Sequence, residues 1–268
     1  MSIKVLVSTM NNSNPKNLLG KMNVSSDAII INQCQFNKLD SFEINGNQIT
    51  YVCCDEKGLS KSRNKAILSA DESDICLLAD DDLVYVQNYK ELVGKAFVEN
   101  PTYDILAFQV EGIDRFFKSY PQKSKQLGYL SSLKVSSVEI AFKAKKLKKK
   151  NINFNELFGS GAYYKMGEEN LFLHDCLRKG LKIKYIPIKV ADLYMGDSTW
   201  FKGFTYEYFV DRGAVFAAMS KGYSRFLIMQ FALRKYKLYK NETSLKDAIK
   251  SMFYGRKQYF KKISGESL

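Results

Sequence analysis

The chain has 268 residues, 46% of them hydrophobic and 26% charged, which is ordinary for a globular protein with a sizeable core and gives no sign of intrinsic disorder. Lys and Arg number 41 against 28 Asp and Glu, so the formal net charge is +13. Such an excess favours a polyanionic partner, either nucleic acid or an anionic membrane surface. The lysine run at 143–150 has a simpler interpretation, a solvated helix face.

Five cysteines without CxxC spacing indicate buried thiols in a reducing compartment rather than disulfides or a zinc site. The apolar run near the N-terminus is too short for a signal peptide. No stretch approaches the roughly 18 uninterrupted apolar residues that a spanning helix needs. We therefore expect a cytoplasmic protein, with peripheral contact to the inner face of the cell membrane as an open alternative.

The first hundred residues alternate between strand and helix patterns. Apolar runs predict strands at 3–9, 27–33, 48–54, 74–82 and 104–110. Helical spacing predicts helices at 58–70 and 88–101, on either side of the fourth strand. Continuous apolar strands that alternate with helices predict an α/β fold, a Rossmann-like, mostly parallel sheet covered by helices on both faces.

The rest of the chain is less uniform. Residues 111–160 have loop character, and a helix with Glu168 and Glu169 at its start then leads to a strand at 183–193. Residues 203–240 are helical in pattern, with one apolar face ringed by basic residues. The apolar face consists of Phe226, Met229, Leu233 and Tyr236, and the ring of Arg225, Arg234, Lys235, Lys237 and Lys240. This pattern predicts either packing against the α/β part or binding at an anionic membrane interface.

Three aspartates, Asp80, Asp81 and Asp82, end the fourth predicted strand. Carboxylates so close repel one another and raise one another's pKa, unless water, a basic side chain or a metal ion lies among them. Ligands of parallel sheets bind beyond the carboxyl ends of the strands, and an extended chain would project Asp80 and Asp82 to the same side. Such a pair suits Mg²⁺ or Mn²⁺, and a capped, solvated turn is the alternative.

Glu168 and Glu169 allow two interpretations. Acidic residues in a first helical turn usually complement the helix dipole. A carboxylate at a helix start that faces a pocket can instead act as a general base toward a hydroxyl group.

Three motifs in order resemble the family 2 glycosyltransferases of the GT-A fold. They are "GLSKSRNKAI", then "LLADDD", then "FGSGAYYKMGEENLFLHDCLRKGLKIKYIP". The resemblance extends from about Ile3 to Thr199. It implies a nucleotide-sugar-binding and catalytic domain at 1–200, followed by a helical, basic region at 201–268.

The resemblance also implies roles for single residues at the donor site. The nucleotide-sugar-binding positions are Ser8, Thr9, Asn11, Asn32, Gln33, Arg63, Asn64, Asp80 and Asp81. Asn32 and Gln33 stand where the family usually has an aspartate that contacts the base, and an amide can still hydrogen-bond a uracil edge. Asp80 and Asp82 correspond to the Asp-x-Asp motif that binds Mn²⁺ or Mg²⁺, with Asp82 the more direct ligand.

For catalysis, the resemblance implies that Glu169 is the base of an inverting enzyme, with Glu168 as the alternate. An ordinary Glu is ionised at neutral pH, so we expect no tuning of its pKa. Many relatives have a further metal ligand, a histidine, near the end of this region. "YMGDSTWF" has none, which leaves Asp197, water or phosphate oxygens to complete the shell, while Trp200 could stack on an acceptor sugar.

The function implied is transfer of a sugar from a nucleotide-diphosphate sugar, with UDP favoured, to a saccharide or lipid-linked acceptor in cell-surface polysaccharide synthesis. A sugar nucleotidyltransferase is an alternative, but "STMNNSNPKN" lacks the glycines of a triphosphate-binding loop. A basic nucleic-acid-binding protein is another. No nucleic-acid motif is present and the aspartates would repel a polyanion, so we expect no nucleic-acid partner. A catalytically inactive nucleotide-sugar binder also remains open.

Overall fold

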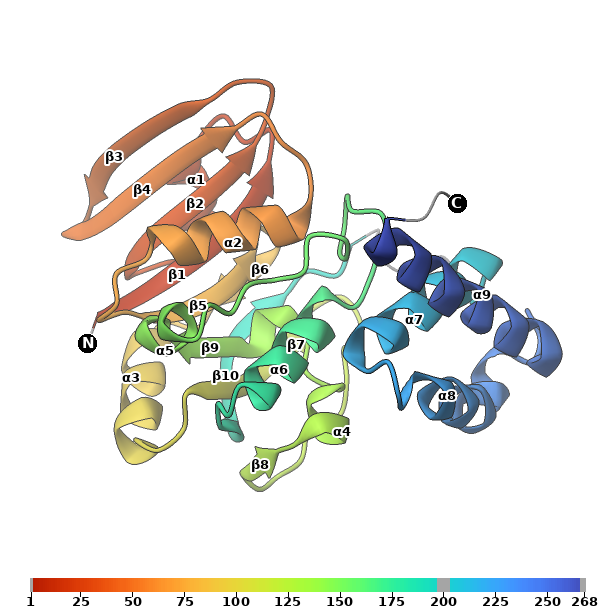
Figure 1. The fold of residues 1–268 in the computed structure, drawn as a ribbon. Coiled ribbons are helices and arrows are strands. Elements are labelled where there is room, and N and C mark those ends of the chain that lie inside the picture. Colours follow the sequence, from red (N-terminus) through yellow and green to blue (C-terminus); the bar gives the residue numbers. More distant parts are fainter. Residues whose placement is uncertain (1, 197–202, 266–268) are drawn as a thin grey trace.

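The computed structural model describes residues 2–196 and 203–265, and a ten-stranded sheet forms its centre (Figure 1). The strand order is β3-β4-β2-β1-β5-β9-β7-β10-β6, and β8 also pairs with β10. The strands are β1 (Ile3–Met10), β2 (Asp27–Gln33), β3 (Lys38–Ile44), β4 (Asn47–Cys54), β5 (Ile75–Asp80), β6 (Leu83–Tyr85), β7 (Ile105–Gly112), β8 (Lys125–Leu127), β9 (Ile140–Lys143) and β10 (Ile183–Leu193).

The helices of the described part include six that accompany the sheet and three that follow it. The first six are α1 (Pro15–Lys21), α2 (Leu59–Ser69), α3 (Tyr89–Glu99), α4 (Tyr129–Ser132), α5 (Ala144–Lys149) and α6 (Glu168–Arg178). The last three are α7 (Tyr206–Met219), α8 (Ser224–Tyr239) and α9 (Leu245–Ser264). A short 3₁₀ turn at Ser137–Glu139 precedes β9.

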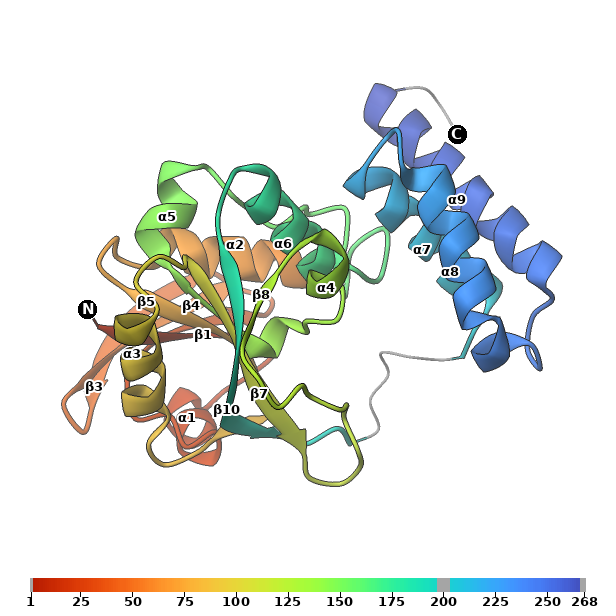
Figure 2. The same ribbon diagram turned by 90° about the horizontal axis from the view of Figure 1, so that it is seen from below.

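Strands β4, β2, β1 and β5 run parallel, as do β7 and β10, so more of the paired residues are parallel than antiparallel. All six residues of β5 are buried, because helices cover both faces of the sheet. One core cluster lies between the sheet and α1 and α3, and a second lies between the opposite face and α2, α5 and α6 (Figure 2). The predicted α/β class is confirmed, and the carboxyl ends of β1 and β5 are neighbours, with Ser8 in register with Asp80.

The sequence-based assignment missed two kinds of strand. The edge strand β3 alternates between exposed and half-buried residues, so it lacks the apolar run that marked the others. The four-residue strand β9 lies in the segment expected to be irregular, yet it inserts antiparallel between β5 and β7. Strand β9 joins the two halves of the sheet.

Helices α7, α8 and α9 share a third core cluster (Figure 1). Helices α7 and α9 touch backbone to backbone at two glycines. A Cβ atom added at Gly213 would overlap the backbone of Met252, and one added at Gly255 would overlap the backbone of Val210. The crossing therefore depends on the missing side chains at these two positions.

Helix α8 has two apolar sides. Ile228, Ala232 and Tyr239 are buried, and α8 packs through this side against α7 and α9. The predicted face is on the other side, where Phe226 is 64% and Leu233 59% exposed. Packing against the α/β part, one of the two alternatives, is therefore wrong for this face, because helical periodicity cannot tell which of two apolar sides is turned inward. Other residues of the C-terminal helices do share a core cluster with Phe158, Tyr164 and Leu171. Among the described residues, no helix is both long and apolar enough to span a membrane.

Candidate active site

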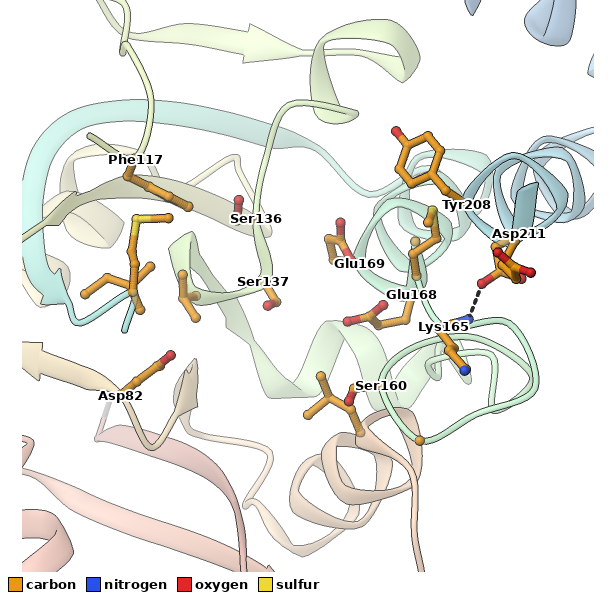
Figure 3. Close-up of a pocket in the computed structure, with 18 of the residues that line it drawn as sticks. Asp82, Phe117, Ser136, Ser137, Ser160, Lys165, Glu168, Glu169, Tyr208 and Asp211 are labelled. Atoms are coloured by element: carbon orange, nitrogen blue, oxygen red, sulfur yellow. Dashed lines mark hydrogen bonds between the residues drawn. The ribbon is translucent and has the colours of Figure 1, made fainter. Parts of the chain in front are cut away.

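A cavity of about 690 Å³ opens where the sheet meets the C-terminal helices (Figure 3). Its walls come from the turn after β5, the segment 136–138, the loop and helix start at 160–169, and the segment 203–211. Three of the predicted site residues line it: Asp82, Glu168 and Glu169. The cavity thus joins the end of β5 to the start of α6.

Helix α2 places Arg63 beneath this cavity, almost without solvent contact, at 1% exposure. Its Nη2 donates to Asp80 Oδ1 at 3.0 Å and to Ser137 Oγ at 2.8 Å, and its Nη1 donates to Glu168 Oε1 at 3.0 Å. The two carboxylates raise the pKa of Arg63 against the opposing effect of its burial. Arg63 was expected beside the nucleotide; the structure instead places it as a buried link between β5 and α6.

The three aspartates diverge after β5, which ends at Asp80. Asp80 is bound by Arg63, and Asp81 accepts a hydrogen bond from Thr9 Oγ1 at 2.5 Å. Asp82 points into the cavity, and its buried Oδ1 has no hydrogen-bond partner in the described part of the chain (Figure 3). The expected alternation assumed an extended chain as far as Asp82, whereas Asp81 and Asp82 lie in a turn.

The electrostatics of Asp82 follow from this placement. Burial is the main reason that its pKa rises, to about 7, and the charges of Asp80 and Asp81 add to the effect. Because the Asp82 carboxylate has no partner and is costly to ionise, it favours the binding of a cation. Arg63 compensates only part of the negative charge of the aspartate cluster, at Asp80.

At the start of α6, Gly167 adopts φ +84°, and a Cβ there would lie 2.6 Å from Val215 Cγ2 of α7. This tight approach fixes the two glutamates that follow. Glu168 is 6% exposed and bound to Arg63, whereas Glu169 is half-buried and faces the cavity (Figure 3). Burial, and then the charge of Glu168, raises the pKa of Glu169 to about 8. The expectation of an untuned Glu is thus wrong.

Several cavity residues carried no signal in the sequence. From the region assigned as loop come Phe117, Ser136 and Ser137, and from the C-terminal helical part come Thr205, Glu207, Tyr208 and Asp211. The carboxylate of Asp211 accepts a hydrogen bond from the Lys165 backbone N–H at 2.9 Å, which ties α7 to the loop before α6 (Figure 3). Ser160, which lies between two glycines of the third motif, also lines the cavity.

Ser8, Thr9 and Asn11 lie at the end of β1, as predicted from their position in the chain. Ser8 and Thr9 are buried, and Ser8 Oγ accepts a hydrogen bond from Ser62 of α2 at 2.8 Å. Asn11 is exposed with φ 51°, and its N–H donates to Gln33 O at 3.0 Å. Of the three, Asn11 is the one whose side chain is open to a ligand.

The predicted amide contacts are placed differently. Asn32 is 1% exposed, and its side chain both donates to Asn12 O at 2.9 Å and accepts from Asn12 N–H at 2.8 Å. Gln33 donates to Gly58 O at 3.1 Å, and Asn64 donates to the backbone C=O of Phe154 and accepts from its N–H. These amides hold the loops around the site, so they are poorly placed to contact a nucleotide.

The residues fit a divalent ion only in part. Asp82 offers a free carboxylate oxygen, which suits Mn²⁺ or Mg²⁺, whereas Asp80 already forms an ion pair with Arg63. Within the described ranges no group of three or more His, Cys, Asp or Glu is arranged to hold a metal. An ion here would need most of its ligands from water or from a bound diphosphate. Asp197 and Trp200, expected as a metal ligand and an acceptor contact, lie outside the described residues.

No protein-family model and no curated protein matches this sequence. Several solved structures are nevertheless similar to this one. TarS of S. aureus (residues 1–349) is 13% identical with a TM-score of 0.62, over 99% of this chain and 92% of that one. Its complex with UDP-GlcNAc is 14% identical, also with a TM-score of 0.62, over 99% and 93%. The mannosyltransferase PcManGT from Pyrobaculum calidifontis, in complex with GDP-Man and Mn²⁺, is 11% identical with a TM-score of 0.50, over 100% and 76%. The chain therefore has the fold of GT-A glycosyltransferases.

Proposed function

We propose that this protein is an inverting, metal-dependent glycosyltransferase of family 2. It would move a sugar from a nucleotide-diphosphate sugar, with UDP favoured, to a saccharide or lipid-linked acceptor in cell-surface polysaccharide synthesis. One observation carries the proposal: two acidic side chains that form no ion pair with any described residue, Asp82 and Glu169, enter a single cavity of a GT-A fold (Figure 3). Their neighbours Asp80 and Glu168 each form an ion pair with Arg63.

Asp82 is the residue that would hold the divalent ion. That ion would offset the charge that the diphosphate gains as the glycosidic bond breaks. The raised pKa of Asp82 supports the assignment, since a nearby cation restores the ionised form that burial disfavours. Asp80, expected to share the ion, would act indirectly by fixing Arg63.

Glu169 is the proposed base. It would take the proton of the acceptor hydroxyl while the hydroxyl oxygen attacks the anomeric carbon from the face opposite the diphosphate. A single displacement of this kind inverts the configuration. A pKa near the working pH suits a general base, because a more basic carboxylate accepts the proton more readily once it is ionised. Glu168 is not an equivalent alternate, because its carboxylate is bound to Arg63.

The acceptor would approach from the α7 side of the cavity. Glu207 and Asp211 supply carboxylate oxygens there, and Lys165 supplies an ammonium group. Carboxylates and ammonium groups hydrogen-bond sugar hydroxyls well. The C-terminal region, 201–268, would thus complete the acceptor site of the catalytic domain.

The proposal is tested by thermal unfolding of the purified chain with UDP, GDP, CDP and dTDP, each with and without Mn²⁺. A ligand that binds only the native state raises the midpoint by mass action. One nucleotide should raise it chiefly when the metal is present, and a sugar linked to that nucleotide should then be turned over. If no nucleotide raises the midpoint with or without metal, the proposed function is wrong. Binding without turnover of any acceptor would indicate a nucleotide-sugar-binding protein that is not an enzyme.

A further inference from the structure

The outer side of α8 carries a continuous apolar stripe, which we call the α8 stripe. It consists of Phe226, Met229, Leu233 and Tyr236, which are 64%, 39%, 59% and 38% exposed. Their spacing of three or four residues puts them on one side of the helix over three turns. A neighbouring side of α8, with Ile228, Ala232 and Tyr239, is buried against α7 and α9, whereas Phe226 and Leu233 of the stripe are mostly exposed.

The charge around the α8 stripe has a single sign. No Asp or Glu occurs between Arg212 and Asn241. Exposed cations lie near the stripe. Arg225 and Lys237 flank it and Lys240 extends it, while Arg234 and Lys235 lie farther round the helix. None of these five forms an ion pair with any residue that the structure describes. An apolar strip with exposed cations beside it and beyond its end matches the surface of a bilayer with anionic headgroups.

We infer that the α8 stripe docks this protein on an anionic lipid bilayer, with α8 lying in the plane of the interface. The inference rests on the proposed function for its purpose, since it would bring the active site to a lipid-linked acceptor. A second copy of the chain fits this face poorly, because the exposed cations of two identical faces would repel each other. Nucleic acid would attract the cations but would leave Met229 and Leu233 without an apolar partner.

The two kinds of side chain contribute differently to such docking. Burying one large apolar side chain strengthens binding by roughly tenfold or more. Each Lys or Arg near the surface adds about fivefold, and salt weakens this part. Binding should therefore need anionic lipid, fall with added salt and still depend on Phe226 and Leu233.

The experiment is flotation of the full chain with vesicles of phosphatidylcholine alone or mixed with phosphatidylglycerol, without nucleotide or metal. The apolar test variant is Phe226→Ser/Leu233→Ser, and its control is Leu68→Ser/Val98→Ser, at two positions on α2 and α3 that are 77% and 72% exposed. The charge test variant is Arg234→Glu/Lys237→Glu. Its control is Lys145→Glu/Lys149→Glu on α5, which makes the same charge change in the lysine run.

We expect the wild type and both controls to float with the anionic vesicles, and both α8 variants to lose at least about tenfold in binding. All four variants should keep the wild-type unfolding midpoint, because their positions are exposed. Equal binding by the α8 variants and the wild type overturns the inference, as does binding only to RNA or heparin. It is also overturned if the wild type self-associates in solution and Phe226→Ser/Leu233→Ser abolishes this. Because no nucleotide is used, failure here leaves the proposed enzymatic function untouched, and failure of that function leaves this result standing.

Discussion

The end of β5 presents three closely spaced carboxylates and the start of α6 presents two, and Arg63 pairs with one acid of each region. In each, the first acid is bound by Arg63: Asp80 at the strand, Glu168 at the helix. In each, another acid, Asp82 or Glu169, enters the cavity without such a partner, and its pKa rises to about 7 or about 8.

In both regions the inner acid, Asp80 or Glu168, supports the structure, and the outer acid, Asp82 or Glu169, is available for chemistry. One buried guanidinium holds the strand end and the helix start together, and its charge is used on the two inner acids. For the outer acids, burial and nearby like charges still disfavour the ionised form. Groups whose pKa values are displaced in this way are typical of functional sites.

Replacing the outer acid of α6 should have the largest effect. Glu169→Gln removes the proposed base but keeps its size, so we expect kcat to fall by about 10²–10⁴-fold. Nucleotide binding should be unchanged, and the variant should be at least as stable as the wild type above pH 8, because it no longer carries a poorly solvated charge there. Full activity in this variant would end the assignment of the base.

Replacing the shared cation should act on stability instead. Arg63→Met leaves Asp80 and Glu168 without their partner, and we expect a loss of about 3–5 kcal/mol in the free energy of unfolding. Denaturation by urea would measure it. A loss below about 1 kcal/mol, the range of surface ion pairs, would mean that Arg63 does not hold the two regions together.

The pH dependence of the wild type sharpens the comparison within α6. Glu169 must be ionised to act as a base, and its pKa is raised to about 8. Thus kcat/KM should rise about tenfold per pH unit below that value and level off above it. If kcat/KM instead levelled off above about pH 4.3, the ordinary pKa of Glu, the result would contradict the desolvated setting of Glu169.

The glycine crossing gives a smaller effect and a matched pair of variants. Gly213→Ala pushes α7 away from α9, and we expect a loss of about 1–3 kcal/mol together with weaker activity, because α7 lines the cavity. Gly94→Ala in α3 has open space around the new Cβ, so it should stabilise the protein by about 0.5–1 kcal/mol. Thermal unfolding of the two variants side by side measures both. Equal effects would show that the close crossing is not needed.

Much of the fold was predictable because local patterns carried it. The buried strands β1, β2, β4, β5 and β7 are continuous apolar runs, and α2, α3 and α6 have clear helical spacing. The edge strand β3 and the short β9 were not predictable, since both take their structure from pairing with distant strands. The side of α8 that packs was also hidden, because both sides are apolar.

At the site, the sequence predicted acids that line one cavity, but it did not predict their ion-pair partners. Asp82 and Glu169 were named from spaced motifs, and the structure places both in one cavity. Arg63 forms ion pairs with Asp80 and Glu168, which are 17 and 105 residues away in the sequence. No local sequence pattern predicts such contacts. The α7 residues of the cavity, such as Asp211, are distant in sequence for the same reason.

The central claim, that Asp82 rather than its neighbours meets the metal and the diphosphate, is tested by one comparison of nucleotide binding. The nucleotide that stabilises the wild type would be titrated with and without Mn²⁺ into Asp82→Asn and into Asp81→Asn, whose position is exposed. We predict that Asp82→Asn loses the metal-dependent part of the affinity while Asp81→Asn keeps most of it. If Asp82→Asn retains the full metal dependence, the ion is held elsewhere and the division of the carboxylates into structural and functional members is wrong.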